Sequence, residues 1–196
     1  MSAYSIKSQP VWPALDWDAS GRRHLLLAGA ADAALAAQLA ANAPAALDLI
    51  VLRHDGDAAW HALASATPDA AVHPAPDQTA ALGLLRDLLA GASMGLRLYL
   101  VGSEPLIWAA AQIANAAGLG EAEIRRHRCG TLARPVYCVH CKTVTPAVHT
   151  NLAPCAGCGR TLFVRDHFSR RLGAYMGFQA DAEEPGQLPA VERLYP

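Results

Sequence analysis

Four of the five cysteines occur in two Cys-x-x-Cys pairs, Cys138 with Cys141 and Cys155 with Cys158. Two cysteines that flank a tight turn can direct both sulfurs at one ion, and two such turns complete a tetrahedron. Four thiolates in a tetrahedron suit zinc or iron. The spacing therefore predicts a site for one metal ion, Fe or Zn, with these four cysteines as its ligands.

Two alternatives to this ligand set have to be weighed. Disulfide bonds would need an oxidising compartment, and the N-terminal sequence MSAYSIKSQPVW has no apolar segment of a secretion signal. We therefore expect a cytoplasmic protein whose cysteines bind metal. His140 and His149 lie near the pairs, but four thiolates already complete the shell. A ribbon this small buries little apolar surface, so the metal should supply on the order of 10 kcal/mol of its folding free energy.

The identity of the metal decides what the site can do. Iron bound by four thiolates can change oxidation state and pass one electron, as in rubredoxin, whereas zinc cannot. Gly159 follows the second pair, which resembles the rubredoxin Cys-x-x-Cys-Gly sequence, but Lys142 occupies the matching place after the first pair. The sequence thus leaves two roles open, an electron relay on iron and a structural or assembly role on zinc.

Composition limits the partners of the chain. Its 196 residues suffice for one domain and a small module, and 16 basic against 17 acidic residues give a net charge of −1. This balance does not favour binding to nucleic acid or to an anionic membrane surface. No apolar run approaches the ~18 residues that a membrane span requires.

The sequence up to residue 130 predicts a small doubly wound α/β domain. Short apolar runs alternate with helical segments, which is typical of a parallel sheet covered on both faces. We expect an extended arm over residues 1–23 and the α/β domain over residues 24–130. The prolines at 68, 74 and 76 predict a loop. The expected strands are 24–30, 48–53, 97–101 and 124–128, and the expected helices are 32–42, 57–65, 77–89 and 103–117.

The first strand is followed by the turn AGAADAA, residues 28–34. A dinucleotide site needs a glycine-rich turn here, so that the backbone can approach the pyrophosphate. This turn has one glycine, and Asp32 would oppose a phosphate. We therefore expect no nucleotide cofactor on this chain.

The predicted metal ribbon spans residues 134–178 and ends in a basic segment. Residues 142–154 are long enough for one short hairpin, and 161–164 predict a further strand. Apolar residues at helical spacing predict a C-terminal helix over 165–178, and arginines beside aromatic residues are typical of protein interfaces. Residues 179–196 predict an acidic tail, and Cys129 a buried structural thiol. The predicted partner-docking residues are Arg165, His167, Phe168, Arg170, Arg171 and Tyr175.

Two family resemblances add to these expectations. The segment LYLVGSEPLIWAAAQIANAAGLGEAEI, with Val101-Gly102-Ser103-Glu104-Pro105 at its turn, resembles the last strand, turn and helix of the nucleotide domain in ferredoxin-reductase-type flavoproteins. It lacks the reactive cysteine that precedes the glycine in that family. The resemblance covers residues 24–129 and implies common ancestry rather than retained activity.

The ribbon running into RDHFSRRLGAYMG is similar to the small subunit of bacterial dimethylamine monooxygenase. This resemblance implies a multi-subunit, NADPH-dependent enzyme that demethylates dimethylamine to methylamine and formaldehyde. The implied partners are a haem-containing oxygenase subunit and a flavin/iron–sulfur reductase subunit.

We find no catalytic constellation in the chain itself, such as a P-loop, Gly-x-Ser-x-Gly or His-Glu-x-x-His. The sequence therefore predicts a non-catalytic subunit of an oxidoreductase. The alternatives are a stand-alone zinc-ribbon scaffold and a nucleic-acid-binding module, the latter from the arginines at 165, 170 and 171.

Overall fold

The computed structural model describes residues 8–29, 33–43, 46–52, 65 and 70–196. These residues form two compact units, one of residues 12–130 and one that joins residues 8–11 to 131–196. The first unit is thus inserted in sequence between two parts of the second. None of the helices in the described part of the chain is long and apolar enough to cross a membrane.

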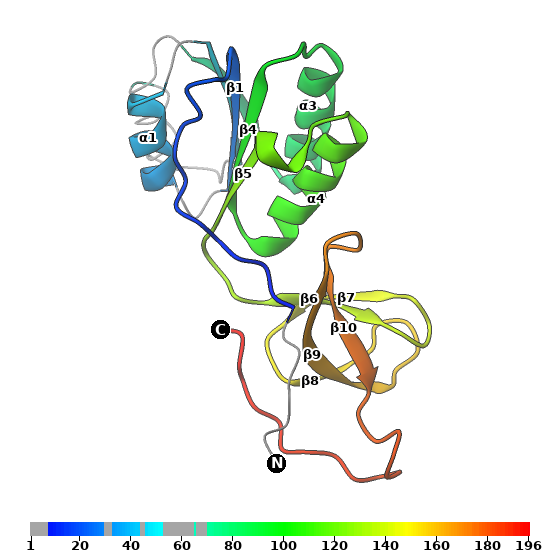
Figure 1. Cartoon of the computed structure of the whole chain (residues 1–196). Coiled ribbons are helices and arrows are strands. Elements are labelled where there is room, and N and C mark those ends of the chain that lie inside the picture. Colours follow the sequence, from blue (N-terminus) through cyan, green and yellow to red (C-terminus); the bar gives the residue numbers. More distant parts are fainter. Residues whose placement is uncertain (1–7, 30–32, 44–45, 53–64, 66–69) are drawn as a thin grey trace, which may run out of the picture. The chain divides into compact units, whose positions relative to one another are not determined.

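The first unit is built on a five-stranded sheet whose strands are all parallel, in the order β3-β2-β1-β4-β5. In Figure 1, α1 covers one face of this sheet, and α3 and α4 cover the other. This confirms the predicted doubly wound α/β architecture. The strands are β1 (Arg23–Ala28), β2 (Leu47–Leu52), β3 (Ala71–Ala75), β4 (Leu96–Gly102) and β5 (Ile124–Arg128), and the helices are α1 (Ala33–Ala41), α3 (Gln78–Ala90), α4 (Glu104–Ala116) and the short 3-10 helix η2 (Glu121–Glu123).

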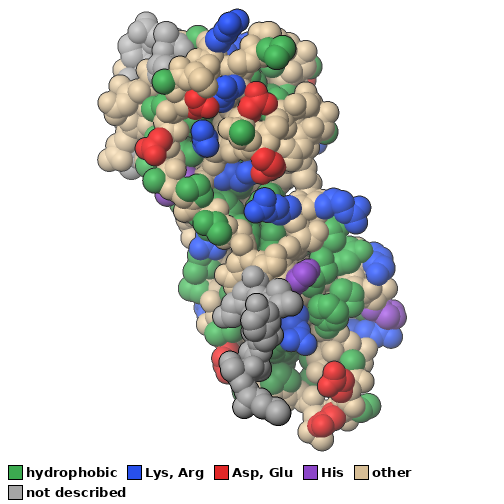
Figure 2. Space-filling model, viewed as in Figure 1, with side chains coloured by type: hydrophobic (Ala, Val, Ile, Leu, Met, Phe, Trp, Pro, Cys, Tyr) green, Lys and Arg blue, Asp and Glu red, His purple; other side chains and the backbone are tan. Residues whose placement is uncertain are grey.

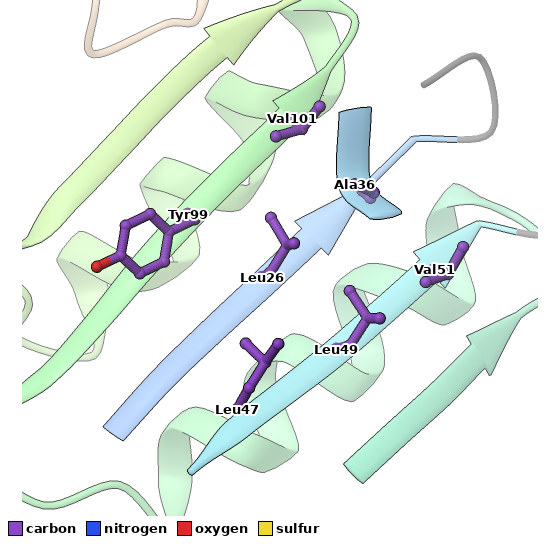
Figure 3. Packing of buried hydrophobic residues seen from close by; sticks show 8 residues of the cluster. Leu26, Ala36, Leu47, Leu49, Val51, Tyr99 and Val101 are labelled. Atoms are coloured by element: carbon purple, nitrogen blue, oxygen red, sulfur yellow. The ribbon is translucent and has the colours of Figure 1, made fainter. Parts of the chain in front are cut away.

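The core of this unit follows from strands that are apolar on both faces, as buried parallel strands must be. On the α1 side, Leu26 of β1, Leu49 of β2 and Tyr99 of β4 lie in one buried cluster with Ala36 of α1 (Figure 3). On the other side, Asp77 is the N-cap of α3, and its side chain accepts a 2.8 Å hydrogen bond from the Ala80 N–H. That N-cap satisfies one of the free amide groups at the start of the helix.

The predicted loop around the prolines at 68, 74 and 76 is wrong for residues 71–75, which form β3 at the edge of the sheet. A proline breaks a central strand because it lacks an N–H, but β3 pairs with β2 on one side only, so Pro74 is tolerated. Among its described residues, the first unit therefore has five strands where the sequence predicted four. The helix predicted over 57–65 falls, except for its last residue, outside the described residues.

The N-terminal arm contributes two tryptophans to the first unit. The Trp17 Nε1–H donates a 3.0 Å hydrogen bond to the Leu39 carbonyl, and its ring packs edge-on against Tyr99 at 4.3 Å between centroids. Trp12 packs edge-on against Trp108 of α4 at 6.2 Å. The arm from residue 12 onward is therefore part of the packed domain.

Between the two tryptophans and β1, Asp18 connects the arm to β4 through side-chain hydrogen bonds. Its carboxylate accepts hydrogen bonds from the Ser20 hydroxyl at 2.6 Å and from the Arg97 guanidinium at 2.7 Å. These two bonds hold the pKa of Asp18 well below its usual range. A carboxyl whose pKa is lowered by folding stabilises the folded state above its unfolded pKa of about 3.9. That contribution is lost as pH falls through the range between the unfolded and the folded pKa.

We therefore expect the first unit to lose stability as pH falls from about 5 to about 2, and Asp18→Asn to make this loss shallower. Urea unfolding midpoints across that pH range measure it. Asp87→Asn, on an exposed position of α3, serves as the matched control. If the unfolding midpoints of wild type and Asp18→Asn fell equally with pH, Asp18 would not be the cause of the acid sensitivity.

The second unit is a mixed five-stranded sheet in the order β7-β6-β10-β9-β8. The predicted hairpin between the two cysteine pairs is wrong, because β7 and β8 lie at opposite edges of the sheet. They pair instead with β6 and β9, respectively. The strands are β6 (Arg134–Cys138), β7 (Val144–Val148), β8 (Leu152–Pro154), β9 (Thr161–Ser169) and β10 (Ala174–Gln179).

The predicted C-terminal helix over 165–178 is also wrong, because this segment forms most of the β9–β10 hairpin. Phe168 and Tyr175 are seven residues apart, which is compatible with two helical turns, but they are paired across the hairpin. The turn closes with a 2.8 Å hydrogen bond from the Gly173 N–H to the Ser169 carbonyl, and Gly173 has a φ of 61°. That left-handed conformation favours glycine and ends any helix at this point.

Backbone hydrogen bonds hold the acidic tail beyond β10 against the second unit. The Tyr195 N–H donates to the His149 carbonyl at 3.0 Å, and the Asn151 N–H donates to the Glu192 carbonyl at 3.0 Å. Tyr195 is buried, and the Arg134 guanidinium lies 3.8 Å from its ring centroid. The last residues of the chain therefore pack as part of the second unit.

Candidate metal centre

The four cysteines of the two Cys-x-x-Cys pairs converge in the second unit. Their sulfur atoms all lie within 4.8 Å of one another. The Sγ atoms of Cys141 and Cys155 are 3.4 Å apart, and those of Cys138 and Cys158 are 3.9 Å apart. A disulfide would need about 2.05 Å, whereas four sulfurs at about 2.3 Å from a shared ion would lie about 3.8 Å apart. The donor set therefore fits one tetrahedral metal ion.

Two turns with the same hydrogen-bond pattern present these sulfurs. The Cys138 N–H donates to the Thr143 carbonyl at 2.9 Å, and the Lys142 N–H donates to the Cys138 carbonyl at 2.9 Å. In the second turn, the Cys155 N–H donates to the Arg160 carbonyl at 2.8 Å, and the Gly159 N–H donates to the Cys155 carbonyl at 3.0 Å. The partners have the same spacing in both turns, so the two pairs form matching knuckles.

Each knuckle has one residue with a positive φ immediately after its second cysteine. Gly159 has a φ of 72° and Lys142 has a φ of 68°. Lysine pays about 1 kcal/mol for this conformation, which glycine adopts freely. The Lys142 ammonium donates a 2.6 Å hydrogen bond to the Val139 carbonyl within the same turn. The lysine at the glycine position therefore does not change the shape of the first knuckle.

Hydrogen bonds from the knuckles favour the thiolate form of two of the sulfurs. The Thr143 hydroxyl and N–H lower the pKa of Cys141 to about 6. The backbone N–H of Cys158, followed by that of Gly157, lowers the pKa of Cys155. Burial raises the pKa of Cys138 to about 11. A bound cation would supply the positive charge that keeps all four sulfurs ionised together.

Gly157 lies where the second knuckle meets the first. A Cβ at this position would clash with the Thr143 side chain, whose Cβ would be 2.8 Å away, and would lie 3.1 Å from the Cys141 Sγ. Its N–H donates to the Cys155 Sγ at 3.4 Å. The absence of a side chain at residue 157 thus permits the close approach of the two knuckles.

Gly157→Ala is expected to lower metal affinity about tenfold, because supporting groups around a metal typically contribute ten- to a hundredfold. Competition with a chromophoric chelator measures this. Ala156→Ser, at the neighbouring exposed position, should bind as tightly as wild type. Equal affinities for Gly157→Ala and Ala156→Ser would contradict the packing argument.

The two histidines near the knuckles have other contacts. The His140 Nδ1 lies 2.8 Å from Arg160 Nη1, and the His149 Nδ1 lies 2.7 Å from the Tyr195 carbonyl. Among the described residues, the group that could hold a metal consists of the four cysteines. Cys129 belongs to the first unit, where it is half-buried against the core cluster.

The predicted docking residues separate into two groups. Phe168 and Tyr175 are buried and in edge-on contact at 4.9 Å, so they form the core of the second unit rather than its surface. The other four are exposed, and their docking role stays a prediction. These are Arg165, His167, Arg170 and Arg171.

Sequence reasoning missed three features that support the site. Thr143 and Gly157 lie between the knuckles, and only the fold places them in contact. Thr145 of β7 accepts a 3.0 Å hydrogen bond from the Ala156 N–H through its hydroxyl. A hydroxyl four residues after a cysteine pair carries no recognisable pattern, so none of these contacts could be inferred from spacing.

Comparison with known proteins agrees with this two-unit arrangement of an α/β domain and a four-cysteine ribbon. Residues 4–124 match the N-terminal domain, and residues 135–178 the C-terminal domain, of the family described as dimethylamine monooxygenase subunit DmmA-like. The chain belongs to this DmmA-like family.

A curated relative from Ectopseudomonas mendocina (strain ymp), the heme-dependent oxidative N-demethylase delta subunit, is 45% identical over 104 residues. The match covers 53% of this chain and 59% of that protein. Among solved structures, phthalate dioxygenase reductase is 18% identical with a TM-score of 0.47, covering 68% of this chain and 47% of that chain. The Amycolatopsis cytochrome P450 reductase GcoB is 16% identical with a TM-score of 0.43, covering 57% of this chain and 38% of that chain.

Proposed function

We propose that this chain is a metal-bearing, non-catalytic subunit of a haem-dependent enzyme that oxidatively demethylates dimethylamine to methylamine and formaldehyde. The observation that carries the proposal is the pair of matching knuckles, whose four sulfurs lie within 4.8 Å of one another. The name of the curated relative supports the class of complex. The thiols are free, which suits a reducing compartment such as the cytoplasm.

Iron held by Cys138, Cys141, Cys155 and Cys158 would allow one-electron transfer, whereas zinc would stabilise the subunit for assembly. The chain's own part is the same in both cases. The knuckles hold four sulfurs at tetrahedral spacing, and backbone N–H groups of the second knuckle donate to the Cys155 sulfur. Backbone N–H groups near the sulfurs of an iron site raise its reduction potential by stabilising negative charge.

We propose further that the first unit retains no nicotinamide cofactor. The support is the turn sequence, which places Asp32 where a phosphate would lie. Ala30 to Asp32 are outside the described residues, so the proposal rests on chemistry rather than on geometry. A clear thermal shift of the purified chain with NADPH would refute it.

The partners that we propose are a haem-containing oxygenase subunit and a flavin/iron–sulfur reductase subunit. Exposed arginines at the β9–β10 turn support a contact with one of them, since arginine is enriched at protein interfaces. Arg170 and Arg171 lie between the end of β9 and the start of β10. A nucleic-acid partner is not favoured by the net charge of −1.

Arg170→Glu combined with Arg171→Glu is expected to leave metal content unchanged and to weaken assembly at least tenfold, because reversed charges at an interface repel the partner. Co-purification with co-expressed oxygenase and reductase subunits measures this. Arg193→Glu, at an exposed position of the tail, is the matched control. Unaltered co-purification of the double variant would count against a docking role for this turn.

A further inference from the structure

The second sheet has a buried inner face and an outer face that is partly exposed, and the strand registers assign residues to each. Val136, Val164 and Tyr175 are buried. Tyr175 is paired with Val136, and Val164 with Gly177 of β10, so these positions share the inner face. Because side chains alternate along a strand, the residues between them point outward.

The outward residues form one continuous apolar row across four strands. Val144 of β7 is paired with Tyr137 of β6, and Tyr137 is paired with Met176 of β10. Two residues further along β10, Phe178 is paired with Phe163 of β9. We call these five residues, Tyr137, Val144, Phe163, Met176 and Phe178, the outer strip.

The outer strip is accessible to solvent. Phe178 is 44% exposed and Val144 is 41% exposed, while Tyr137, Phe163 and Met176 are half-buried. In Figure 2, hydrophobic side chains gather on this unit with Lys or Arg and His side chains beside them. Aromatic and methionine side chains on one exposed surface are the residues that protein interfaces enrich.

A cation lies over the aromatic rings at each end of the strip. The Arg165 guanidinium is 5.3 Å from the ring centroid of Phe163 and 5.9 Å from that of Phe178. The Lys142 ammonium is 5.9 Å from the ring centroid of Tyr137. Asp181, just beyond β10, is engaged by hydrogen bonds from Gln179 and from the Gly186 N–H. Both charged groups that lie over the rings are therefore positive, which is complementary to carboxylates on a partner.

The strip also adjoins the candidate metal centre. Tyr137 directly precedes Cys138, and Lys142 directly follows Cys141. Cys141 and Cys158 are only half-buried, whereas Cys138 and Cys155 are buried. A partner that covers the Tyr137 end of the strip would therefore lie next to the first knuckle.

We propose that the outer strip is the docking surface for an acidic face of a partner protein subunit. The aromatic rings would be buried at the centre of that contact, and Arg165 and Lys142 would pair with carboxylates at its rim. This inference rests on the proposed function, because it takes the partner to be another subunit of the same enzyme. It differs from the sequence-based docking segment, residues 165–178, since three of its five apolar residues, Tyr137, Val144 and Phe163, come from outside that segment.

Single-stranded nucleic acid is the other macromolecule that stacks on exposed rings. It needs a positively charged groove that follows the phosphate backbone. The strip carries two cations, at opposite ends, and the chain has a net charge of −1. These charges suit discrete carboxylates better than a continuous row of phosphates.

The test measures binding of the full-length, metal-loaded chain to the purified oxygenase subunit and to the purified reductase subunit of the same organism. The strip variants are Phe178→Ser and Arg165→Glu, made separately so that one remains if the other fails to fold. The control is Leu188→Ser, which removes an apolar side chain of the tail with a similar exposure of 51%. Metal content and circular dichroism verify that each variant is folded.

We expect wild type and Leu188→Ser to bind one of the two subunits equally, and each strip variant to bind it at least tenfold more weakly. Strip variants that bind as tightly as wild type would overturn this inference and leave the proposed function intact. Wild type that binds neither subunit would overturn both. If wild type bound a single-stranded 15-nucleotide RNA and Phe178→Ser abolished that binding, the inference that this surface binds a protein would be overturned.

Discussion

Replacing Cys155 with serine is expected to abolish metal binding and to unfold the second unit, while the first unit stays folded. Cys155 is 4% exposed, and its backbone also closes the second knuckle. A three-thiolate remainder cannot complete the tetrahedral shell, and a structural metal contributes on the order of 10 kcal/mol to the folding of such a module. The two units have separate cores, so the loss should remain confined to the second unit.

Elemental analysis and heteronuclear NMR of the same sample measure this result, and Cys138→Ser should behave in the same way. Cys129→Ser is the matched control, because it removes a thiol of the first unit that does not belong to the group of four sulfurs. Normal metal content in either knuckle variant would exclude the four-thiolate site. Collapse of both units together would contradict their independence.

Arg134→Ala is expected to destabilise the second unit by about 3 kcal/mol, since it breaks a mostly buried ion pair and two ring contacts. The guanidinium donates to the Asp166 carboxylate at 2.8 Å and lies 4.0 Å from the ring centroid of Tyr175. On its other side it lies 3.8 Å from the ring centroid of Tyr195. Loss of Arg134 would therefore free the tail and leave Asp166 without this partner.

Chemical denaturation and limited proteolysis of residues 180–196 measure the effect of the Arg134 substitution. Arg134→Lys keeps the charge but loses the planar group that stacks between two rings, so its stability should lie between those of wild type and Arg134→Ala. A tail that stays protected in Arg134→Ala would show that backbone bonds such as Tyr195 to His149 suffice without the stacked arginine.

The sequence predicted the elements whose pattern is local. Runs such as RHLLLA in β1 and LRLYLV in β4 are apolar on both faces, which indicates buried parallel strands wherever they occur. The four cysteines were equally clear, because the spacing within each pair is set by one tight turn. These features depend on few residues, so they can be predicted without knowledge of the fold.

The sequence did not predict the features that depend on pairing between segments far apart in the chain. Phe168 and Tyr175 fit a helical period, and only the positive φ of Gly173 and the pairing of β9 with β10 show that they face each other in a hairpin. Pro74 suggested a loop because edge and central strands cannot be told apart before the sheet order is known. The outer strip was missed for the same reason, since its residues are adjacent only through three strand registers.

The proposed role of this chain depends on its four paired cysteines holding one metal ion together. Elemental analysis of anaerobically purified protein, combined with metal-edge X-ray absorption on the same sample, tests it most directly. We expect one iron or zinc per chain, with four sulfur ligands at about 2.3 Å. A visible thiolate-to-iron band that bleaches on reduction would assign the electron-transfer role, and a colourless zinc protein the structural role. A metal-free chain that is fully folded, or a metal with nitrogen or oxygen ligands, would contradict the claim.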